Sequence, residues 1–464
     1  MLNDYRYGFT TSHAEEWQVL VQVCQRWQQI IYGSPRYLDL HLHCSNAAPF
    51  RNNHSRWPEF PLTLKYVLYP DEDDLEDFDD LVAALEQSDR VHLIHFMTRS
   101  SKEGLDSRVD RVLEKMKVPF PALTYLNLIG TVLPHGFLGG SAPCLQRLYL
   151  ENVSPILFQE LPKLLLSARN LTSLRLEDIP KCPGYISLEA MVGGLAGLTK
   201  LRTLSINFRF PREIPDSNEV LGHRRRPEPS MRAVLPALTK FVFNGESAYL
   251  EDIVAQIDMP SVEDIKIEYF PPTVEVHELS QFICRTKNLD LTQFKHAQVD
   301  FDIGTLIGTA YSHIKLDQPQ GQGEHREFRF SLGVKISISA LDDLVACMTR
   351  VLGQLTVLLS NVRNLSLKEE YGWQDWYAEC FHLDDSKLLP LLHLFPAVEA
   401  LHVYGLLVYH IRTALENIDE ERVSEVMPAL RSLQFDNGYW PLAYCGRFLS
   451  LRQLSGHPVA AVRI

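Results

Sequence analysis

The sequence predicts an α/β fold, a solenoid in which short parallel strands form a sheet and helices lie outside it. The first observation is an LxxLxL motif that occurs three times, at Leu123–Leu128, Leu145–Leu150 and Leu171–Leu176. The last two apolar residues of each motif alternate with a polar residue, which is the period of a short strand with one buried face. The second observation is that the motif recurs with helix candidates between its copies. Such units must stack on one another to bury their apolar faces.

Further copies of the motif show that the solenoid is irregular. They begin at Leu201, Leu238, Val262, Val362, Val398 and Leu430. Successive motifs start 22 residues apart from Leu123 to Leu145, but 37 residues apart from Leu201 to Leu238. Regular leucine-rich repeats keep to about 20–29 residues. We therefore predict a degenerate leucine-rich-repeat solenoid over residues 46–464, with an exposed insertion near residues 210–232.

The ninth position of the motif lacks the asparagine or cysteine that regular repeats use to satisfy backbone groups after the strand. The residues there are Thr131, Val153, Ile179, Arg209 and Glu246. Without an asparagine ladder, the turns must satisfy their backbone groups in another way. We therefore expect irregular curvature.

Apolar spacing also places the other elements. Helices are predicted at residues 154–167, 187–194, 249–256, 340–359, 385–394 and 411–417. Strands outside the clear motifs are predicted at residues 37–44, 62–69, 298–301, 312–316 and 327–338, the last three as degraded copies in the same sheet. In the strand that begins at Val91, alternation places Val91, Leu93 and His95 on one face, opposite His92, Ile94 and Phe96.

Composition limits the compartment and the partners. A formal net charge of −13 argues against a nucleic-acid scaffold, which would need a concentrated basic surface. The longest apolar runs fall short of the ~20 residues of a membrane span, and residues 1–12 do not resemble a signal peptide. The eight cysteines are scattered without a CxxC pair, which is typical of a reducing compartment. We expect a cytoplasmic or nuclear protein that binds neither nucleic acid nor membrane.

Three polar clusters suggest chemistry, and a simpler interpretation is favoured for each. His41, His43 and Cys44 are metal-ligand types, but Cys44 points to the opposite face of the predicted strand. Asp71–Asp80 holds eight acidic residues, yet it lacks the glycine and terminal glutamate of a calcium loop, so an acidic loop before a helix is favoured. Arg224–Arg226 could contact phosphate or form a localisation signal, but a solvated loop is favoured. No nucleotide loop, nucleophile elbow or HExxH string occurs, so we expect no enzyme activity, cofactor or metal.

The first predicted helix spans residues 14–32. Its apolar face has spacings of three and four and contains Trp17, Leu20, Cys24, Trp27 and Ile31. From periodicity alone, the helix caps the open end of the solenoid, because terminal units need a cover. If the chain is a stand-alone solenoid, we expect Trp17, Leu20 and Trp27 to be buried.

The residues of this helix also resemble the second half of an F-box. The resemblance is carried by Val23-Cys24-Gln25-Arg26-Trp27, Ile30-Ile31 and Ser34-Pro35-Arg36. The first half of an F-box is not found in residues 1–13. Further strings make nearly the whole chain similar to the F-box-like, leucine-rich-repeat-like proteins of mushroom-forming fungi. They include Tyr37-Leu38-Asp39-Leu40, Trp57-Pro58-Glu59-Phe60-Pro61, Gly139-Gly140-Ser141-Ala142-Pro143, Leu164-Leu165-Leu166-Ser167-Ala168 and Leu454-Ser455-Gly456-His457-Pro458.

The resemblance implies a partial F-box-like helix and N-terminal cap over residues 1–45, followed by the irregular solenoid. By analogy with F-box proteins, it implies a substrate-recognition subunit of a Skp–cullin–F-box ubiquitin ligase. A Skp-type cullin adaptor would contact the helix through Leu20, Val23, Cys24, Trp27 and Ile31. The alternative is a stand-alone leucine-rich-repeat module that binds protein and has no ligase role.

The sheet face that points away from the helices is the predicted surface for an unknown protein substrate. Strand residues between the leucines of each motif point to that face. The candidates are Tyr125, Asn127, Arg147, Tyr149 and Arg175.

Overall fold

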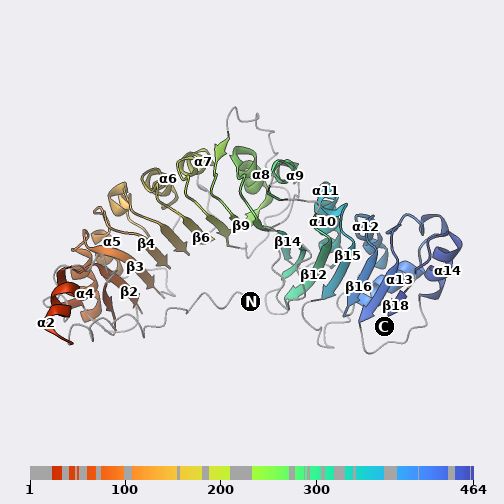
Figure 1. The fold of residues 1–464 in the computed structure, drawn as a ribbon, viewed down its shortest axis with the longest axis horizontal. Helices are drawn as coiled ribbons and strands as arrows, with labels where there is room; N and C mark the ends of the chain where they lie inside the picture. The colour runs from red at the N-terminus through yellow and green to blue at the C-terminus, as the bar shows by residue number, and fades with distance from the viewer. Residues whose placement is uncertain are drawn as a thin grey trace. The chain divides into compact units, whose positions relative to one another are not determined.

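Short strands alternate with helices along the chain in the computed structural model (Figure 1). The structure describes residues 23–33, 41–46, 50–51, 60–68, 75–98, 107–153, 157–179, 188–209, 232–270, 277–286, 288–289, 293–304, 309–317, 330–337, 341–369, 384–405, 407–436, 445–459 and 461–463. Trp17, Leu20 and the predicted insertion at 210–231, with Arg224–Arg226, lie outside these residues. The chain forms two compact units, residues 1–203 and residues 204–464. Each unit is mixed α/β, with a mostly parallel sheet.

The described strands of the first unit follow one another in chain order across its sheet, and each pairs in parallel with the next. They are β1 (Leu42–Ser45), β2 (Leu62–Leu68), β3 (Val91–Thr98), β4 (Tyr125–Ile129), β5 (Arg147–Glu151) and β6 (Ser173–Ile179). The three clear motifs thus form β4, β5 and β6. Their two inner leucines are buried; Leu126, Leu128, Leu148 and Leu150 are each no more than 2% exposed.

Helices precede, separate or follow these strands in the chain and lie along one side of the sheet (Figure 1). They are α2 (Gln25–Gly33), α4 (Leu75–Leu85), α5 (Ser107–Lys115), α6 (Leu157–Ser167) and α7 (Leu188–Ala196), with a 3-10 turn η2 (Phe137–Gly140). Neighbouring helices touch closely. A side chain at Gly194 of α7 would lie 3.3 Å from Cβ of Leu165 in α6, so glycine at this position permits the close approach.

One predicted face in β3 is wrong. Leu62 of β2 pairs with Val91 and Thr63 pairs with Leu93, so the strand register skips His92, which forms a bulge. The bulge puts Val91 in the core, whereas Leu93 and His95 point to the other face. A bulge moves every following residue by one position, which simple alternation does not anticipate.

The second unit contains two reversals of strand direction. Its strands are β7 (Thr203–Phe208), β8 (Ala233–Val234), β9 (Lys240–Glu246), β10 (Ile257–Asp258), β11 (Asp264–Phe270), β12 (His296–Gly304), β13 (Thr309–Asp317), β14 (Phe330–Ser337), β15 (Asn364–Glu369), β16 (Ala400–Tyr404), β17 (Ser432–Asp436) and β18 (Ala461–Arg463). In its main sheet the strand order is β7, β9, β11, β14, β13, β12, β15, β16, β17 and β18, while β8 and β10 pair separately.

The three degraded motifs predicted between residues 298 and 338 are not successive parallel repeats. β12 pairs antiparallel with β13, and β13 pairs antiparallel with β14. The outer strands of this meander join the flanking parallel sheet, β14 beside β11 and β12 beside β15. The chain therefore reverses its strand direction twice here.

The helices of the second unit mostly match the predicted ranges. They are α8 (Ser247–Gln256), α9 (His277–Arg285), α10 (Leu341–Gln354), α11 (Thr356–Leu359), α12 (Leu388–His393), α13 (Leu407–Glu416) and α14 (Gly446–Leu454), with 3-10 turns η5 (Asp385–Lys387) and η6 (Glu420–Arg422). The predicted helix 340–359 is divided into α10 and α11. Among the described helices of the chain, none has both the length and the apolar composition of a membrane span.

The turns after the strands use backbone hydrogen bonds instead of an asparagine ladder. The eighth motif position has left-handed backbone at Gly130 (φ 69°), Asn152 (φ 51°), Asp178 (φ 54°) and Gly405 (φ 72°). Glycine, asparagine and aspartate are the residues that adopt this conformation most readily. In this geometry the Gly130 N–H donates to the Glu151 carbonyl at 2.9 Å, and the Asn152 N–H donates to the Glu177 carbonyl at 3.0 Å.

Candidate protein-binding surface

The five predicted surface residues of the first unit lie together on one face of its sheet. In register across β4, β5 and β6, Tyr125 is opposite Arg147, and Asn127 is opposite Tyr149, which is opposite Arg175. Their side chains alternate with the buried leucines, so they point away from the helices. The labelled helices in Figure 1 lie on the other side of these strands. The structure therefore brings all five residues together on a face that no helix among the described residues covers, the uncovered face.

Two glutamates adjoin this group and are bound by a tyrosine hydroxyl. Oη of Tyr149 lies 2.5 Å from Oε2 of Glu151 and 3.1 Å from Oε2 of Glu177. Burial, the hydrogen bond to Glu151 and the charge of Glu177 all raise the pKa of the Tyr149 hydroxyl. The hydroxyl therefore stays protonated and remains a hydrogen-bond donor to the carboxylates at neutral pH.

Within the described residues, the two arginines on the same face remain unpaired. In the described part of the chain, the guanidinium groups of Arg147 and Arg175 form no hydrogen bond, ion pair or ring contact. Arg147 is exposed and Arg175 is half-buried. Asn127 is 9% exposed, and its Oδ1 accepts no hydrogen bond from any described residue. These groups can form ionic and hydrogen-bonding contacts with a partner.

The face continues over β2 and β3 with further basic side chains. Lys65 is opposite His95, which is opposite Asn127, so the three extend the same row. Burial lowers the pKa of Lys65, and burial together with the Lys65 charge lowers the pKa of His95. Burial, Lys65 and His41 lower the pKa of His43 on β1 to about 4. The histidines are therefore neutral at pH 7, and Lys65 and the two arginines supply the positive charge.

On the second unit, most strand cations already have partners within the sheet. Nζ of Lys240 lies 2.7 Å from Asp264. Asp300, which is 1% exposed, binds Nζ of Lys315 at 2.8 Å and Nε2 of His313 at 3.1 Å. Nζ of Lys368 lies 5.1 Å from the centre of the Tyr404 ring, within cation–π range. Among the described strand residues, Lys266 is the exposed lysine that has no such partner. The basic side chains of this face are therefore paired with acidic or aromatic groups of the same sheet more often than those of the first unit.

The predicted adaptor-contacting residues lie on or next to α2, as far as they are described. Leu20 lies outside the described residues, and Ile31 lies within the helix. Val23 is 61% exposed, Trp27 is 47% exposed and Cys24 is also exposed. Ile30, which was not among the predicted contacts, is 53% exposed and extends the same apolar stripe. None of the side chains from residue 23 to residue 30 is buried. The burial of Trp27 expected for a stand-alone solenoid is therefore not observed.

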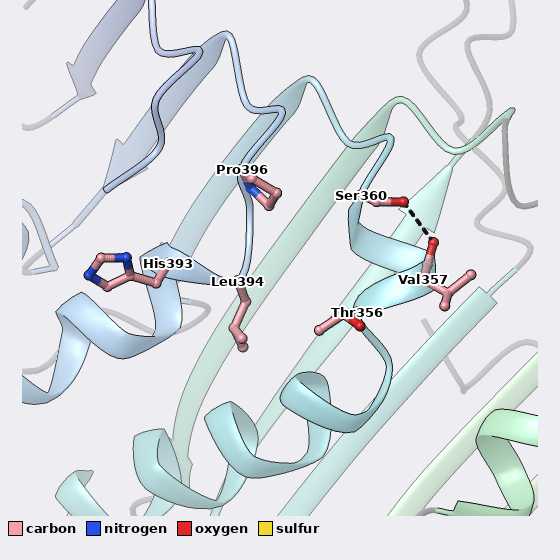
Figure 2. A pocket seen from close by; sticks show the side chains of 6 residues that line it. All are labelled: Thr356, Val357, Ser360, His393, Leu394 and Pro396. Carbon is pink, nitrogen blue, oxygen red and sulfur yellow. Dashed lines mark hydrogen bonds between the residues drawn. The ribbon is translucent and has the colours of Figure 1, made fainter. Parts of the chain in front are cut away.

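A small hollow lies on the helical side of the second unit (Figure 2). Its volume is about 380 Å³, and it is lined by Thr356, Val357, Ser360, His393, Leu394 and Pro396. The Ser360 hydroxyl donates to the Val357 carbonyl at 3.1 Å, and the His393 ring points away from Ser360 in Figure 2. The lining fits one apolar side chain better than a polar substrate, because few polar groups converge on the hollow.

The histidines near β1 do not form a metal site with Cys44. Cys44 is fully buried on the core side of β1, and burial raises the pKa of its thiol to about 12, whereas His43 lies on the other face. The ring centres of His41 and His92 are 5.4 Å apart in an edge-to-face contact. Over the described residues, no group of three metal-ligating side chains converges.

Sequence reasoning missed four residues of the uncovered face. Lys65 and His95 belong to strands that lack the clear motif, so their place in the row depends on a register that includes the bulge. Glu151 and Glu177 occupy the seventh motif position, one residue beyond the last leucine. Continued alternation past that leucine was a signal that could have identified the two glutamates.

No protein-family model matches the sequence, and a search of curated proteins finds no significant match. Function is therefore inferred from the surfaces described above.

Proposed function

We propose that the chain is a protein-interaction scaffold and that the uncovered sheet face of the first unit binds a protein partner. The observation that carries the proposal is the row of polar side chains on this face, with the guanidinium groups of Arg147 and Arg175 unpaired among the described residues. A sheet face of rigid strands with aromatic and arginine side chains is typical of protein-binding surfaces. The chain acts by binding and not as an enzyme.

The architecture that we propose is a degenerate leucine-rich-repeat solenoid. Support comes from the parallel pairing of β4, β5 and β6, the recurring left-handed residue after the strand, and the contacts between successive helices. In solenoids each repeat contacts only its neighbours and leaves one long face free for binding. The antiparallel meander β12–β14 is an insertion within this plan.

The role that we propose for the N-terminal helix is to dock a Skp-type cullin adaptor, so that the chain recruits substrates to a Skp–cullin–F-box ubiquitin ligase in the cytoplasm or nucleus. The exposed apolar side chains of Val23, Trp27 and Ile30 support this role, because exposed apolar residues at helical spacing are typical of a docking helix. The residues of α2 resemble the C-terminal part of an F-box.

Binding to a purified Skp-type adaptor tests the ligase role. We expect the full chain to bind the adaptor and the double variant Trp27→Ala/Ile30→Ala to lose at least about tenfold in affinity, because large buried apolar side chains dominate such interfaces. The matched control is Val118→Ala/Leu166→Ala, which removes apolar groups that are 45% and 58% exposed elsewhere on the first unit. Absence of binding by the unaltered chain would leave the alternative, a stand-alone protein-binding module.

Co-purification tests the scaffold role independently of the adaptor. The full chain is isolated from its source cells beside Tyr125→Ser/Arg175→Gln, altered on the uncovered face, and Leu166→Ser/Arg169→Gln, altered at exposed positions elsewhere on the first unit. We expect a stoichiometric partner that is lost from the first variant and retained by the second. Equal recovery with both variants would place binding elsewhere.

A further inference from the structure

We propose that the partner contributes an extended acidic segment, which lies across the strands of the first unit and pairs its carboxylates with Arg147 and Arg175. This inference rests on the proposed function and specifies the chemistry of the partner. It identifies a protein segment, because the same surface also offers an acceptor for a peptide N–H.

The polar side chains of this face are arranged to contact a linear segment. Lys65, His95, Asn127, Tyr149 and Arg175 form one row across five adjacent strands, from β2 to β6. Neighbouring strands lie about 4.8 Å apart, so the row is about 19 Å long, which an extended peptide spans with about six residues. Arg147 lies beside this row, two positions before Tyr149 on β5.

Charge complementarity favours an acidic partner. Guanidinium groups form strong two-point contacts with carboxylates, and those of Arg147 and Arg175 form no ion pair within the described residues. Glu151 lies opposite Glu177 in register, and the Tyr149 hydroxyl, not an arginine, donates to Glu151. The arginines therefore stay available although the chain as a whole carries a net charge of −13.

Asn127 indicates that the segment is a peptide. Its side chain is nine-tenths buried at the middle of the row, and its Oδ1 lacks a donor among the described residues. An unsatisfied buried acceptor is costly, and a backbone N–H is a donor that can satisfy it. An extended acidic segment supplies carboxylates and N–H groups together, whereas a free anion supplies only acceptors.

The second unit provides a comparison within the same chain. There, Lys240 and Lys315 are neutralised by aspartates of the same sheet. A sheet face of this fold can therefore neutralise its own cations. The first unit places Glu151 and Glu177 beside its arginines and leaves those arginines unpaired within the described residues.

Fluorescence anisotropy with labelled peptides tests the inference on the full chain. The probes are peptides of about eight residues, long enough for the row, with serine alternating with glutamate, lysine or glutamine. We expect the glutamate peptide to bind at least about tenfold more tightly than the other two at low salt and to weaken as salt is added. Tighter or equal binding of the lysine peptide, or no binding of the glutamate peptide up to about 1 mM, would overturn the inference.

Matched variants locate the bound peptide. We expect Arg147→Gln/Arg175→Gln to weaken binding of the glutamate peptide about tenfold, since one exposed and one half-buried ion pair are lost. Arg147→Lys/Arg175→Lys keeps the charge and should retain part of the affinity, whereas Arg169→Gln/Arg350→Gln makes the same charge change at exposed positions away from the row and should have no effect. Unchanged affinity in the first variant would refute the site. If a co-purifying protein still depends on the uncovered face, the scaffold proposal survives that refutation.

Discussion

Asp300 shows how a single charged residue is accommodated in the sheet of the second unit. Its carboxylate accepts hydrogen bonds from Gln298 at 2.7 and 2.9 Å and binds Lys315 and His313. Burial alone raises the pKa of this carboxyl, but the hydrogen bonds from His313 and Lys315 outweigh that effect and hold its pKa below the usual value. The charge is stable in the sheet because its neighbours supply donors and positive charge.

Replacing Asp300 should therefore destabilise the fold. We expect Asp300→Asn to lower the free energy of unfolding by about 2–4 kcal/mol, because Lys315 would lose its counter-charge and His313 its carboxylate acceptor in a partly buried site. Urea denaturation of the full chain measures this. The matched control is Asp264→Asn, whose ion pair with Lys240 is more exposed and should contribute less than about 1 kcal/mol. Equal losses in the two variants would contradict this account of Asp300.

His43 gives a prediction about pH. Its pKa is about 4 in the folded chain and about 6.5 when exposed, so below pH 6.5 the unfolded state binds more protons than the folded state. The free energy of unfolding should therefore fall as the pH decreases from 6.5 to 4, and His43→Asn should reduce this dependence. Urea denaturation at several pH values measures the slope, with exposed His135→Asn as the control. A slope unaffected by His43→Asn, or reduced equally by both substitutions, would contradict the assignment.

At the scale of elements, the left-handed residue after the strand defines the repeat in the first unit. Gly130, Asn152 and Asp178 have this conformation at equivalent positions. The sequence contained the signal, since all three are residue types that favour it. The prediction considered the ninth motif position, where regular repeats place asparagine, whereas the left-handed residue is at the eighth. The ninth residues Thr131, Val153 and Ile179 are instead buried.

Alanine substitutions at two glycines with similar φ angles distinguish the cost of backbone strain from the cost of a steric clash. Alanine at Gly136 (φ 74°) would meet no neighbouring atom within 4 Å and should lower the free energy of unfolding by about 1–2 kcal/mol through strain alone. A Cβ at Gly130 (φ 69°) would also lie 2.5 Å from the Thr98 carbonyl oxygen, so Gly130→Ala should cost at least about 2 kcal/mol more. Thermal or urea unfolding of the two variants compares them. Equal costs would show that β3 and the turn after β4 do not approach so closely.

Elements with a strong motif were predictable from sequence, because the residues within the motif themselves specify the structure. In β4, β5 and β6 the alternation of leucine with polar residues specifies both the strand and its buried face, and so it identified the five surface residues. The meander β12–β14 could not be predicted in this way, because strand direction depends on pairing between distant segments rather than on local pattern. The bulge at His92 likewise depends on the register between β2 and β3.

For the molecule as a whole, contacts are local within each of its two units. Every described strand pairs only with its immediate neighbours in the sheet order, so a defect in one unit need not destabilise the other. We expect Asp300→Asn to speed amide hydrogen exchange in β12, β13 and β15 while β4, β5 and β6 keep their protection. Mass spectrometry of exchanged peptides measures this. A uniform loss of protection across both units would show instead that the chain unfolds as one cooperative body.

The uncovered face of the first unit is the central functional claim, and site-specific photo-crosslinking tests it most directly. A benzophenone side chain is placed at Tyr125, on the face, or at exposed Leu166 of α6, and each full chain is irradiated with the partner that co-purifies with it. We predict a crosslinked product from position 125 that is absent from position 166 and is reduced by Arg147→Gln/Arg175→Gln. A product from position 166 and none from position 125 would contradict the claim.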